Sequence, residues 1–273
     1  MFDCVRLNNI VVLTRQALQT GLAILLTFGT TGCKTTSSPA THAAQEVTVA
    51  AAANLTDVFH TIGKRFEATT GTHPVFSFAS TAQLTQQIEN SAPFDVFTAA
   101  DATHVDELDR KHLLVAGSRA IYARGVLALW IPQRRKTEGE GIQDLIKPEI
   151  RFIAIAKPEL APYGQASVET LQRLRLWDRV QPKVVYAENI NGAKQYGVSR
   201  NADAVFTAYS LVLQEPGQVI RVGGNLHQPI DQALGVLASS THQEAARKFT
   251  DFLLHGEGRQ ILRDSGYETP GGP

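Results

Sequence analysis

Short apolar runs alternate along the chain with segments in which apolar residues recur every three or four positions. The first run covers residues 47–50 and is continuous, as in strands that are buried on both faces of a sheet. The segment after it carries the apolar stripe of a helix that packs on a sheet, formed by Leu55, Val58, Phe59, Ile62 and Phe66. Repeated alternation of this kind predicts an α/β fold with doubly wound, mainly parallel sheets.

The alternation occurs in two sets, which predicts two lobes. Further strands are expected at residues 75–78, 95–99, 126–131, 152–156, 184–186 and 204–207, and a last helix at 245–261. The chain passes from one set to the other near residue 125 and returns near residue 230. Two hinge crossovers would therefore join lobe 1 (46–125 plus 230–273) to lobe 2 (126–229). Ligands of such sheets bind at the carboxyl ends of strands, which places a ligand in the cleft between the lobes.

The first 45 residues have a different pattern. Positive charges precede an apolar stretch at 17–28, and Gly32-Cys33 follows, which is typical of a lipoprotein-type signal peptide over residues 1–33. A flexible Ser/Thr/Ala-rich linker is expected at 34–45. Lipidation of Cys33 would anchor the protein to the membrane, in the periplasm or at the cell surface. Because Thr30 stands where the lipoprotein motif usually has Leu, Val or Ile, a plain secretory signal stays open.

Polar side chains stand where two of the predicted strands give way to helices. Asn54 follows the alanine run after the first strand, and Ser80 and Thr81 follow the strand at 75–78. The start of a helix presents free backbone N–H groups and the positive end of the helix dipole, so it suits an anion. Each residue alone is explained equally well as an N-cap. Two similar junctions in one lobe favour a shared anion site.

Two turns of lobe 2 are expected to face these junctions. Tyr163 lies in the turn after the strand at 152–156, and it can offer either its hydroxyl or its backbone N–H. Ile190, after the strand at 184–186, can offer only its N–H. Thr207 ends a further strand. The alternative roles are those of packing: an interface aromatic for Tyr163 and a core residue for Thr207.

Composition limits the classes of function. Lys+Arg and Asp+Glu both number 26, so the formal net charge is zero and there is no basic excess for a nucleic acid. Both cysteines, Cys4 and Cys33, lie in the leader, so the mature domain has no disulfide, thiol nucleophile or Cys-ligated metal. The sequence has no nucleophile motif or phosphate-binding loop, and its eight histidines are scattered. These features predict a binding protein without a cofactor rather than an enzyme.

Four segments together resemble the periplasmic molybdate-binding proteins of ABC importers. They are VAAAANL at 49–55, FASTAQL at 78–84, PFDVFTAAD at 93–101 and ADAVFTA at 202–208. The resemblance extends from about Val47 to Tyr267. It implies a two-lobed periplasmic-binding-protein fold of type II, which closes on molybdate or tungstate and delivers it to a membrane permease. A monomer is expected.

The resemblance also implies roles for individual residues. In that family a hydroxyl or amide after the alanine run binds the oxyanion, which corresponds to Asn54, and the second hydroxyl of the Ser-rich turn corresponds to Thr81, with Ser80 beside it. Backbone N–H groups of the second lobe correspond to Tyr163 and Ile190. Some members use a Tyr hydroxyl where this chain has Thr207. Others place a Tyr where Tyr163 stands, and this chain is similar to the second kind.

The expected contact residues also limit which anion fits. A buried carboxylate would repel a dianion unless the ligand carried a proton, as phosphate does near neutral pH. No Asp or Glu occupies the expected contact positions, which argues against phosphate and leaves molybdate, tungstate or sulfate. The alternative is therefore another tetrahedral oxyanion such as sulfate, or a small organic anion. A hydrolase would need a nucleophile–base pair, and none appears in the sequence. A transcription-factor effector domain would need a fused helix-turn-helix, whereas residues 1–45 have the pattern of a secretory leader.

Overall fold

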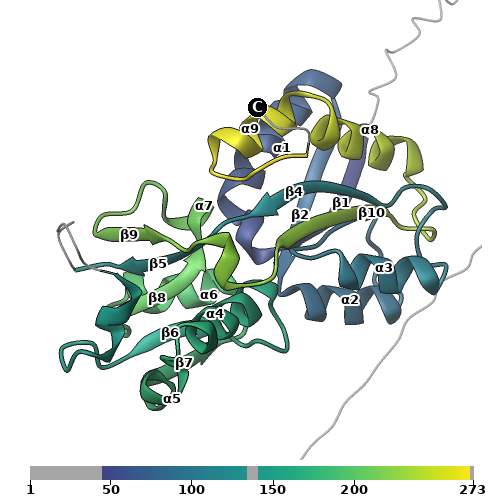
Figure 1. Ribbon diagram of the computed structural model, residues 1–273. Coiled ribbons are helices and arrows are strands. Elements are labelled where there is room, and N and C mark those ends of the chain that lie inside the picture. Colours follow the sequence, from purple (N-terminus) through teal and green to yellow (C-terminus); the bar gives the residue numbers. More distant parts are fainter. Residues whose placement is uncertain (1–44, 134–140, 271–273) are drawn as a thin grey trace, which may run out of the picture. The chain divides into compact units, whose positions relative to one another are not determined.

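The computed structural model describes residues 45–133 and 141–270, which contain two five-stranded sheets (Figure 1). The expected signal peptide, including Cys33, lies outside the described residues. The expected linker at 34–45 also lies outside them, except for its last residue. The first sheet has the strand order β2-β1-β3-β10-β4. Its strands are β1 (Glu46–Ala52), β2 (His73–Ala79), β3 (Val96–Thr98), β4 (Ala120–Gly125) and β10 (Ile230–Val236).

The second sheet has the order β7-β6-β8-β5-β9. Its strands are β5 (Leu127–Ile131), β6 (Ile153–Ala156), β7 (Val184–Ala187), β8 (Ala204–Ala208) and β9 (Gln218–Arg221). The chain enters this sheet directly after β4 and leaves it through residues 222–229, which lead into β10. We call residues 46–125 with 230–270 lobe 1, and residues 126–229 lobe 2.

Each sheet contains four strands that run in one direction and one strand that runs against them. In lobe 1, β10 is antiparallel to both β3 and β4, while β1 is parallel to β2 and β3. In lobe 2, β5 is antiparallel to β8 and β9, while β6 is parallel to β7 and β8. The prediction of mainly parallel sheets is confirmed, and the single reversed strand in each sheet directly follows a crossover.

Helices cover both faces of the lobe 1 sheet (Figure 1). One face is covered by α1, α8 and α9, and the other by α2 and α3. The bounds are η1 (Ala53–Leu55), α1 (Thr56–Thr70), α2 (Thr81–Glu89), α3 (Thr103–Arg110), α8 (Gln243–Leu254) and α9 (Glu257–Asp264). The predicted stripe of α1 is fully buried, and Phe66 packs edge-to-face against Phe249 of α8 with ring centroids 5.2 Å apart.

The lobe 2 sheet is covered in the same way, with α4 on one face and α6 and α7 on the other. The bounds are α4 (Pro162–Arg173), α5 (Trp177–Val180), α6 (Ile190–Val198), α7 (Tyr209–Val212), and the short 3-10 turns η2 (Ile142–Ile146), η3 (Gln181–Lys183) and η4 (Gly224–Leu226). Strand-to-helix junctions of both lobes therefore lie at the carboxyl ends of parallel strands, where the sequence predicted the ligand.

The expected single helix at 245–261 is wrong, because the structure divides it into α8 and α9. Gly256 adopts an extended conformation (ψ −161°) between them. Glycine has a low helix propensity, and a Cβ at Gly258 would lie 2.7 Å from the Phe252 carbonyl oxygen. The first turn of α9 thus lies close against the end of α8.

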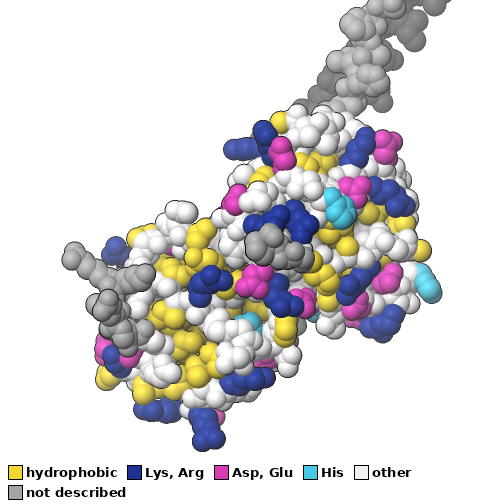
Figure 2. Space-filling view, turned by 45° about the horizontal axis from the view of Figure 1, so that its top comes forward, with side chains coloured by type: hydrophobic (Ala, Val, Ile, Leu, Met, Phe, Trp, Pro, Cys, Tyr) yellow, Lys and Arg dark blue, Asp and Glu magenta, His cyan; other side chains and the backbone are white. Residues whose placement is uncertain are grey.

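Charged side chains of both signs are interspersed over the face of the molecule shown in Figure 2. An attraction for anions therefore has to come from local groups rather than from a surface of one sign. Within residues 45–133 and 141–270, no helix combines the length and the apolar content needed to cross a bilayer.

Candidate oxyanion-binding site

A small cavity lies where helix starts of both lobes converge. It is lined by Ala52, Ala53, Asn54, Ser80, Thr81, Ala100, Ala161, Pro162, Tyr163, Asn189 and Ile190. Five of the six residues that the sequence predicted are in this set, and none of the described residues that line the cavity is charged. The arrangement brings together segments from η1 and α2 of lobe 1 and from α4 and α6 of lobe 2.

Three helices present their first turns to the cavity. Thr81 is the first residue of α2, Tyr163 the second of α4, and Ile190 the first of α6. The first N–H groups of a helix have no partner within the helix, and the helix dipole adds positive potential there. Among the described residues, none accepts a hydrogen bond from these three N–H groups. The cavity therefore offers backbone donors from both lobes to an anion.

Local sequence explains why α4 and α6 begin at these positions. Pro162 occupies the first position of α4, where a missing N–H costs nothing and the fixed φ favours the helix. Asn189 is the N-cap of α6 and accepts a hydrogen bond from the Gly192 N–H at 2.9 Å. The Asn189 side chain thus satisfies an inner N–H of this turn and leaves the Ile190 N–H free.

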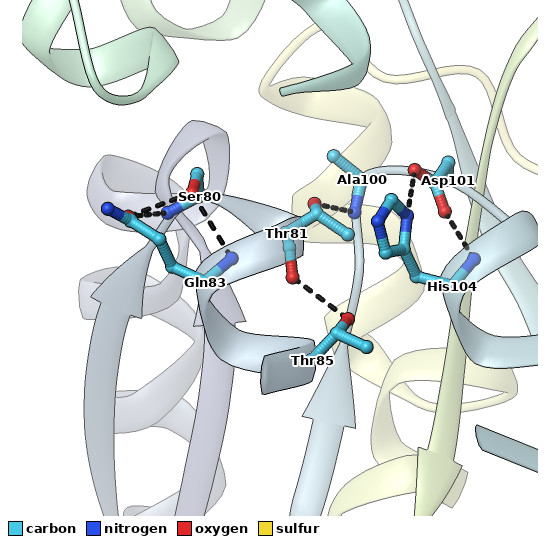
Figure 3. A network of polar contacts seen from close by, with 7 residues as sticks. All are labelled: Ser80, Thr81, Gln83, Thr85, Ala100, Asp101 and His104. Carbon is cyan, nitrogen blue, oxygen red and sulfur yellow. Dashed lines mark hydrogen bonds and ion pairs between the residues drawn. The ribbon is translucent and has the colours of Figure 1, made fainter. Parts of the chain in front are cut away.

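Ser80 and Thr81 are neighbours with different partners (Figure 3). Ser80 is the N-cap of α2 in a capping box with Gln83, and its hydroxyl donates to Gln83 Oε1 at 2.8 Å. Thr81 Oγ1 accepts a hydrogen bond from the Ala100 N–H at 3.1 Å. This bond fixes the Thr81 side chain and leaves its hydroxyl proton without an acceptor among the described residues. Thr81 can donate that proton to an anion, whereas the proton of Ser80 is already engaged.

The carboxylate of Asp101, which follows the lining residue Ala100 in the chain, is engaged by its own helix α3 (Figure 3). Asp101 accepts from the His104 backbone N–H at 2.9 Å and contacts His104 Nδ1 at 2.8 Å. The hydrogen bond to Asp101 raises the pKa of His104 above its ordinary value, against the opposing effect of partial burial. Asp101, directly before the N-cap Ala102, thus accepts from the first turn of α3 and is paired with His104.

Asn54 is not the N-cap that one reading of the sequence allowed. It lies in the turn η1, and α1 begins two residues later at Thr56 without a side-chain cap. Its Nδ2 donates to Gln232 Oε1 and to the Tyr267 hydroxyl, each at 3.1 Å. Its Oδ1 is buried and has no hydrogen-bond partner among the described residues. The side chain therefore belongs to a buried network beside the cavity rather than to the helix start.

The two donors that Tyr163 could offer point to different neighbours. Its hydroxyl lies 2.9 Å from Gln232 Nε2 and accepts that hydrogen bond, so the hydroxyl belongs to the same buried network. Burial raises the pKa of Tyr163 well above its ordinary value, so the phenol is neutral. The backbone N–H is the group of Tyr163 that remains for the cavity.

Thr207 does not line the cavity. It lies in β8, opposite Ala128 of β5, and shares a sheet face with Val205, which packs in the cluster beneath α6 and α7. Its hydroxyl is buried without a partner among the described residues. The alternation of side chains along β8 thus turns it into the interior of lobe 2.

Sequence reasoning missed the polar residues behind the cavity. Gln232, Tyr122 and Tyr267 are all buried and are linked to Asn54 directly or through Gln232. One signal was present: Gln232 interrupts the apolar run of β10 with an amide. A second, larger hollow is lined by residues of both lobes, and Asp101, Glu159 and Glu169 are among them. Its carboxylates make it unsuited to a dianion.

Comparison with known proteins agrees with this geometry. The family model for bacterial extracellular solute-binding proteins matches residues 47–268. The molybdate-binding protein ModA of Rhodobacter capsulatus is 35% identical over 83% of this chain and 90% of its own length. The corresponding ModA of Azotobacter vinelandii is 36% identical over 82% and 90%.

A solved structure gives the same result at the level of the fold. The periplasmic molybdate-binding protein of Azotobacter vinelandii superposes with a TM-score of 0.79 and 30% identity, over 82% of this chain and 99% of that one. The two-lobed architecture, the length of chain that each match covers and the family model lead to one conclusion. This chain belongs to the family of bacterial extracellular solute-binding proteins.

Proposed function

We propose that this chain captures molybdate, and also tungstate, outside the cytoplasm and delivers it to the permease of an ABC importer. The observation that carries the proposal is the uncharged cavity at which helix starts of both lobes present free N–H groups. Its similarity to the ModA proteins of two organisms supports molybdate as the ligand. A transport component of this family has no need of a catalytic group, and we assign none.

The donor set is sufficient for tight binding. It consists of the Thr81 hydroxyl, the N–H groups of Thr81, Tyr163 and Ile190, and the Asn54 amide when its amino group faces the cavity. A hydrogen bond to a charged group contributes about 1.5–3 kcal/mol. Five such bonds contribute about 7.5–15 kcal/mol before the costs of ordering, compared with roughly 8 kcal/mol for a micromolar complex, so bonds near the upper value are needed for tight binding. Ser80 supports the turn through its capping box, and Thr207 lies outside the donor set.

The chemistry of the lining favours an anion without protons. The described lining residues provide no carboxylate, so hydrogen phosphate would lack a charged acceptor for its O–H group. Molybdate, tungstate and sulfate are fully deprotonated near neutral pH. Sulfate, or a small organic anion, is the alternative ligand, and the size of the closed cavity is the feature that separates the larger oxyanions from sulfate.

The leader supports a location outside the cytoplasm. We infer that Cys33 carries the lipid that anchors the protein, and that residues 34–45 tether a monomeric binding domain beside the membrane. Mass spectrometry of the protein from its native membrane tests the anchor. A lipid-modified N-terminal Cys33 is expected, and an unmodified N-terminus produced by a plain secretory signal would contradict it.

Calorimetric titration with molybdate, tungstate, sulfate and phosphate tests the ligand. We expect sub-micromolar binding of molybdate and tungstate, and much weaker binding of sulfate and phosphate. Asn54→Ala should weaken molybdate binding by about 1–2 kcal/mol, since one charge-assisted bond is lost. No heat with molybdate, together with clear binding of sulfate, would replace the main proposal by its alternative.

A further inference from the structure

Gln232 lies at the centre of a buried polar cluster directly behind the cavity. One end of its carboxamide lies 2.9 Å from the Tyr163 hydroxyl. The other end lies 2.8 Å from the Tyr122 hydroxyl and 3.1 Å from the Asn54 carboxamide. Gln232 is fully buried and Asn54 is 1% exposed, so neither amide can obtain its hydrogen bonds from bulk water.

If Asn54 donates to Gln232 Oε1, the hydroxyl and amide protons of this cluster do not match the acceptors around them. The single hydroxyl proton of Tyr122 then faces two acceptors, the Ala99 carbonyl at 3.0 Å and Gln232 Oε1. Tyr163 accepts from Gln232, and its own proton has no acceptor among the described residues. Asn54 Oδ1 is left buried without a partner, at the end of the amide that remains for the cavity. An unpaired oxygen there would repel an anion.

Nitrogen and oxygen of a carboxamide occupy nearly equivalent positions, and exchanging them in both residues gives an acceptor to the Tyr163 proton and partners to Asn54 Oδ1. Tyr163 then donates to Gln232 Oε1, and Gln232 Nε2 donates to Asn54 Oδ1 and to Tyr122. Tyr122 keeps the Ala99 carbonyl as the acceptor of its proton. The hydroxyl of Tyr267 accepts from Ser210. It shares its proton between the backbone carbonyl of Asn54 at 2.8 Å and Asn54 Oδ1, which now takes the position 3.1 Å away. The Asn54 amino group is now the end that faces the cavity.

We propose that Gln232 is a positioning residue, which accepts the Tyr163 hydroxyl proton and donates to Asn54 Oδ1 so that the Asn54 amino group faces the anion. The inference rests on the proposed function, because it concerns the donor that Asn54 supplies to the oxyanion. Gln232 lies in β10 of lobe 1. It would determine which end of the Asn54 amide faces the ligand without contacting the ligand itself.

The direction of this hydrogen-bond chain depends on both lobes. Tyr163 belongs to α4 of lobe 2, whereas Gln232 and Asn54 belong to lobe 1. A carboxamide presents a donor or an acceptor with equal ease until a neighbour fixes it, and Tyr163 reaches Gln232 only when the lobes are together. Closure of the lobes therefore sets the end of Asn54 that binds the anion.

The orientation of Gln232 is measured directly by NMR on the unaltered protein with molybdate present. The side-chain amide protons of Gln232 should show through-space contacts to the ring of Tyr122. The Asn54 side-chain amide resonances should shift when molybdate is added. Contacts of the Gln232 amide protons to the Tyr163 ring, and none to Tyr122, would overturn the proposal.

A double-mutant cycle tests whether Gln232 acts through Asn54. Gln232→Met, of similar length and uncharged, should weaken molybdate binding about tenfold by calorimetry. In the Asn54→Ala background the same change should alter the affinity less than about twofold. Equal losses in both backgrounds would show a general structural role and contradict positioning.

The two proposals fail in different ways. If the protein gives no heat with any oxyanion, the proposed function fails, and the contacts of the Gln232 amide protons are measured in the ligand-free protein. If molybdate binds tightly but Gln232 faces Tyr163 with its amino group, only the positioning role fails. Urea unfolding of each variant shows whether a lost affinity reflects a lost fold.

Discussion

At the residue scale, the two hydroxyls at the start of α2 differ in what their protons do. The Ser80 hydroxyl is occupied by Gln83 and completes the capping box. The Thr81 hydroxyl accepts from the Ala100 N–H and keeps its proton available. Adjacent residues of the same chemical type are thus separated into a structural role and a binding role by their partners alone.

Thr81→Val should weaken molybdate binding by about 1.5–3 kcal/mol, because it removes one charge-assisted donor while keeping the shape of the side chain. Thr81→Ser keeps the hydroxyl and should restore most of the affinity. Ser80→Ala should instead lower the free energy of unfolding by about 0.5–2 kcal/mol, with little change in affinity. Calorimetry and urea unfolding measure the two quantities. A larger loss of affinity for Ser80→Ala than for Thr81→Val would reverse the assignment.

Buried tyrosines make the stability of the fold sensitive to alkaline pH. Burial raises the pKa of Tyr267 from 10.0 to about 12. The unfolded chain loses this proton near pH 10, whereas the folded protein holds it until about pH 12. The contribution of this pKa difference to the free energy of unfolding is therefore fully present below pH 10 and is lost as the pH rises through 12. Its size is about 3 kcal/mol. Urea unfolding between pH 9 and 12 should show a shallower decline for Tyr267→Phe than for the unaltered protein. An identical slope would contradict the assignment.

At the element scale, the position of α4 depends on how closely its first turn approaches β6. A Cβ at Gly164 would lie 2.2 Å from the Ala156 carbonyl oxygen, which is backbone and cannot move aside. Glycine here allows the start of α4, with the Tyr163 N–H, to lie against the end of the strand. At Gly192 in α6 the nearest contact of an added Cβ is 3.4 Å, to the side chain of Ala187.

Gly164→Ala should therefore destabilise the protein and weaken molybdate binding, because α4 must shift and carry its free N–H away from the cavity. Overpacking of a tight site costs about 1–3 kcal/mol. Gly192→Ala is the matched control. Gly192 lies in the first turn of α6, the other lobe 2 helix that begins at the cavity. Its replacement by Ala should leave the free energy of unfolding unchanged or raise it by up to about 1 kcal/mol. Thermal unfolding and calorimetry compare the two, and equal effects would show that close approach is not the reason for Gly164.

Periodicity predicted most of the described strands and the helix junctions, because each depends on a few neighbouring residues, but it missed β4 and β9. The sequence could also place Asn54, Thr81, Tyr163 and Ile190 at junctions of this kind. The division of α8 from α9 depends on a tight contact between Gly258 and Phe252. The spacing of apolar residues along the sequence does not reveal such a contact. The partners of Asn54 are more distant still, since Gln232 lies 178 positions further along the chain. Such contacts follow only from the way the sheets assemble.

At the scale of the whole binding domain, contacts between the lobes hold the cavity closed. The Ala82 N–H of α2 donates to the Leu160 carbonyl of lobe 2 at 3.2 Å. The buried Lys194 of α6 lies 3.4 Å from Asp57 of α1 and 2.8 Å from Glu215 of its own lobe. A ligand enters so small a cavity only if these contacts open, and the two crossovers, at residues 125–126 and 222–229, are the segments about which the lobes can move.

Gly125 is the residue at the first crossover on which closure depends. A Cβ there would lie 2.1 Å from the Tyr163 hydroxyl and 2.6 Å from Gln232 Nε2, so a side chain would occupy the space in which the lobes meet. Gly125→Ala should keep both lobes folded but hold them apart, which weakens molybdate binding at least tenfold, or about 1.4 kcal/mol. Solution scattering should show a larger radius of gyration for the variant with molybdate than for the unaltered protein with molybdate. Gly224→Ala on the returning crossover, where an added Cβ meets nothing within 4 Å, is the control and should bind and close normally. A Gly125→Ala protein that closes as tightly as the control would place the hinge elsewhere.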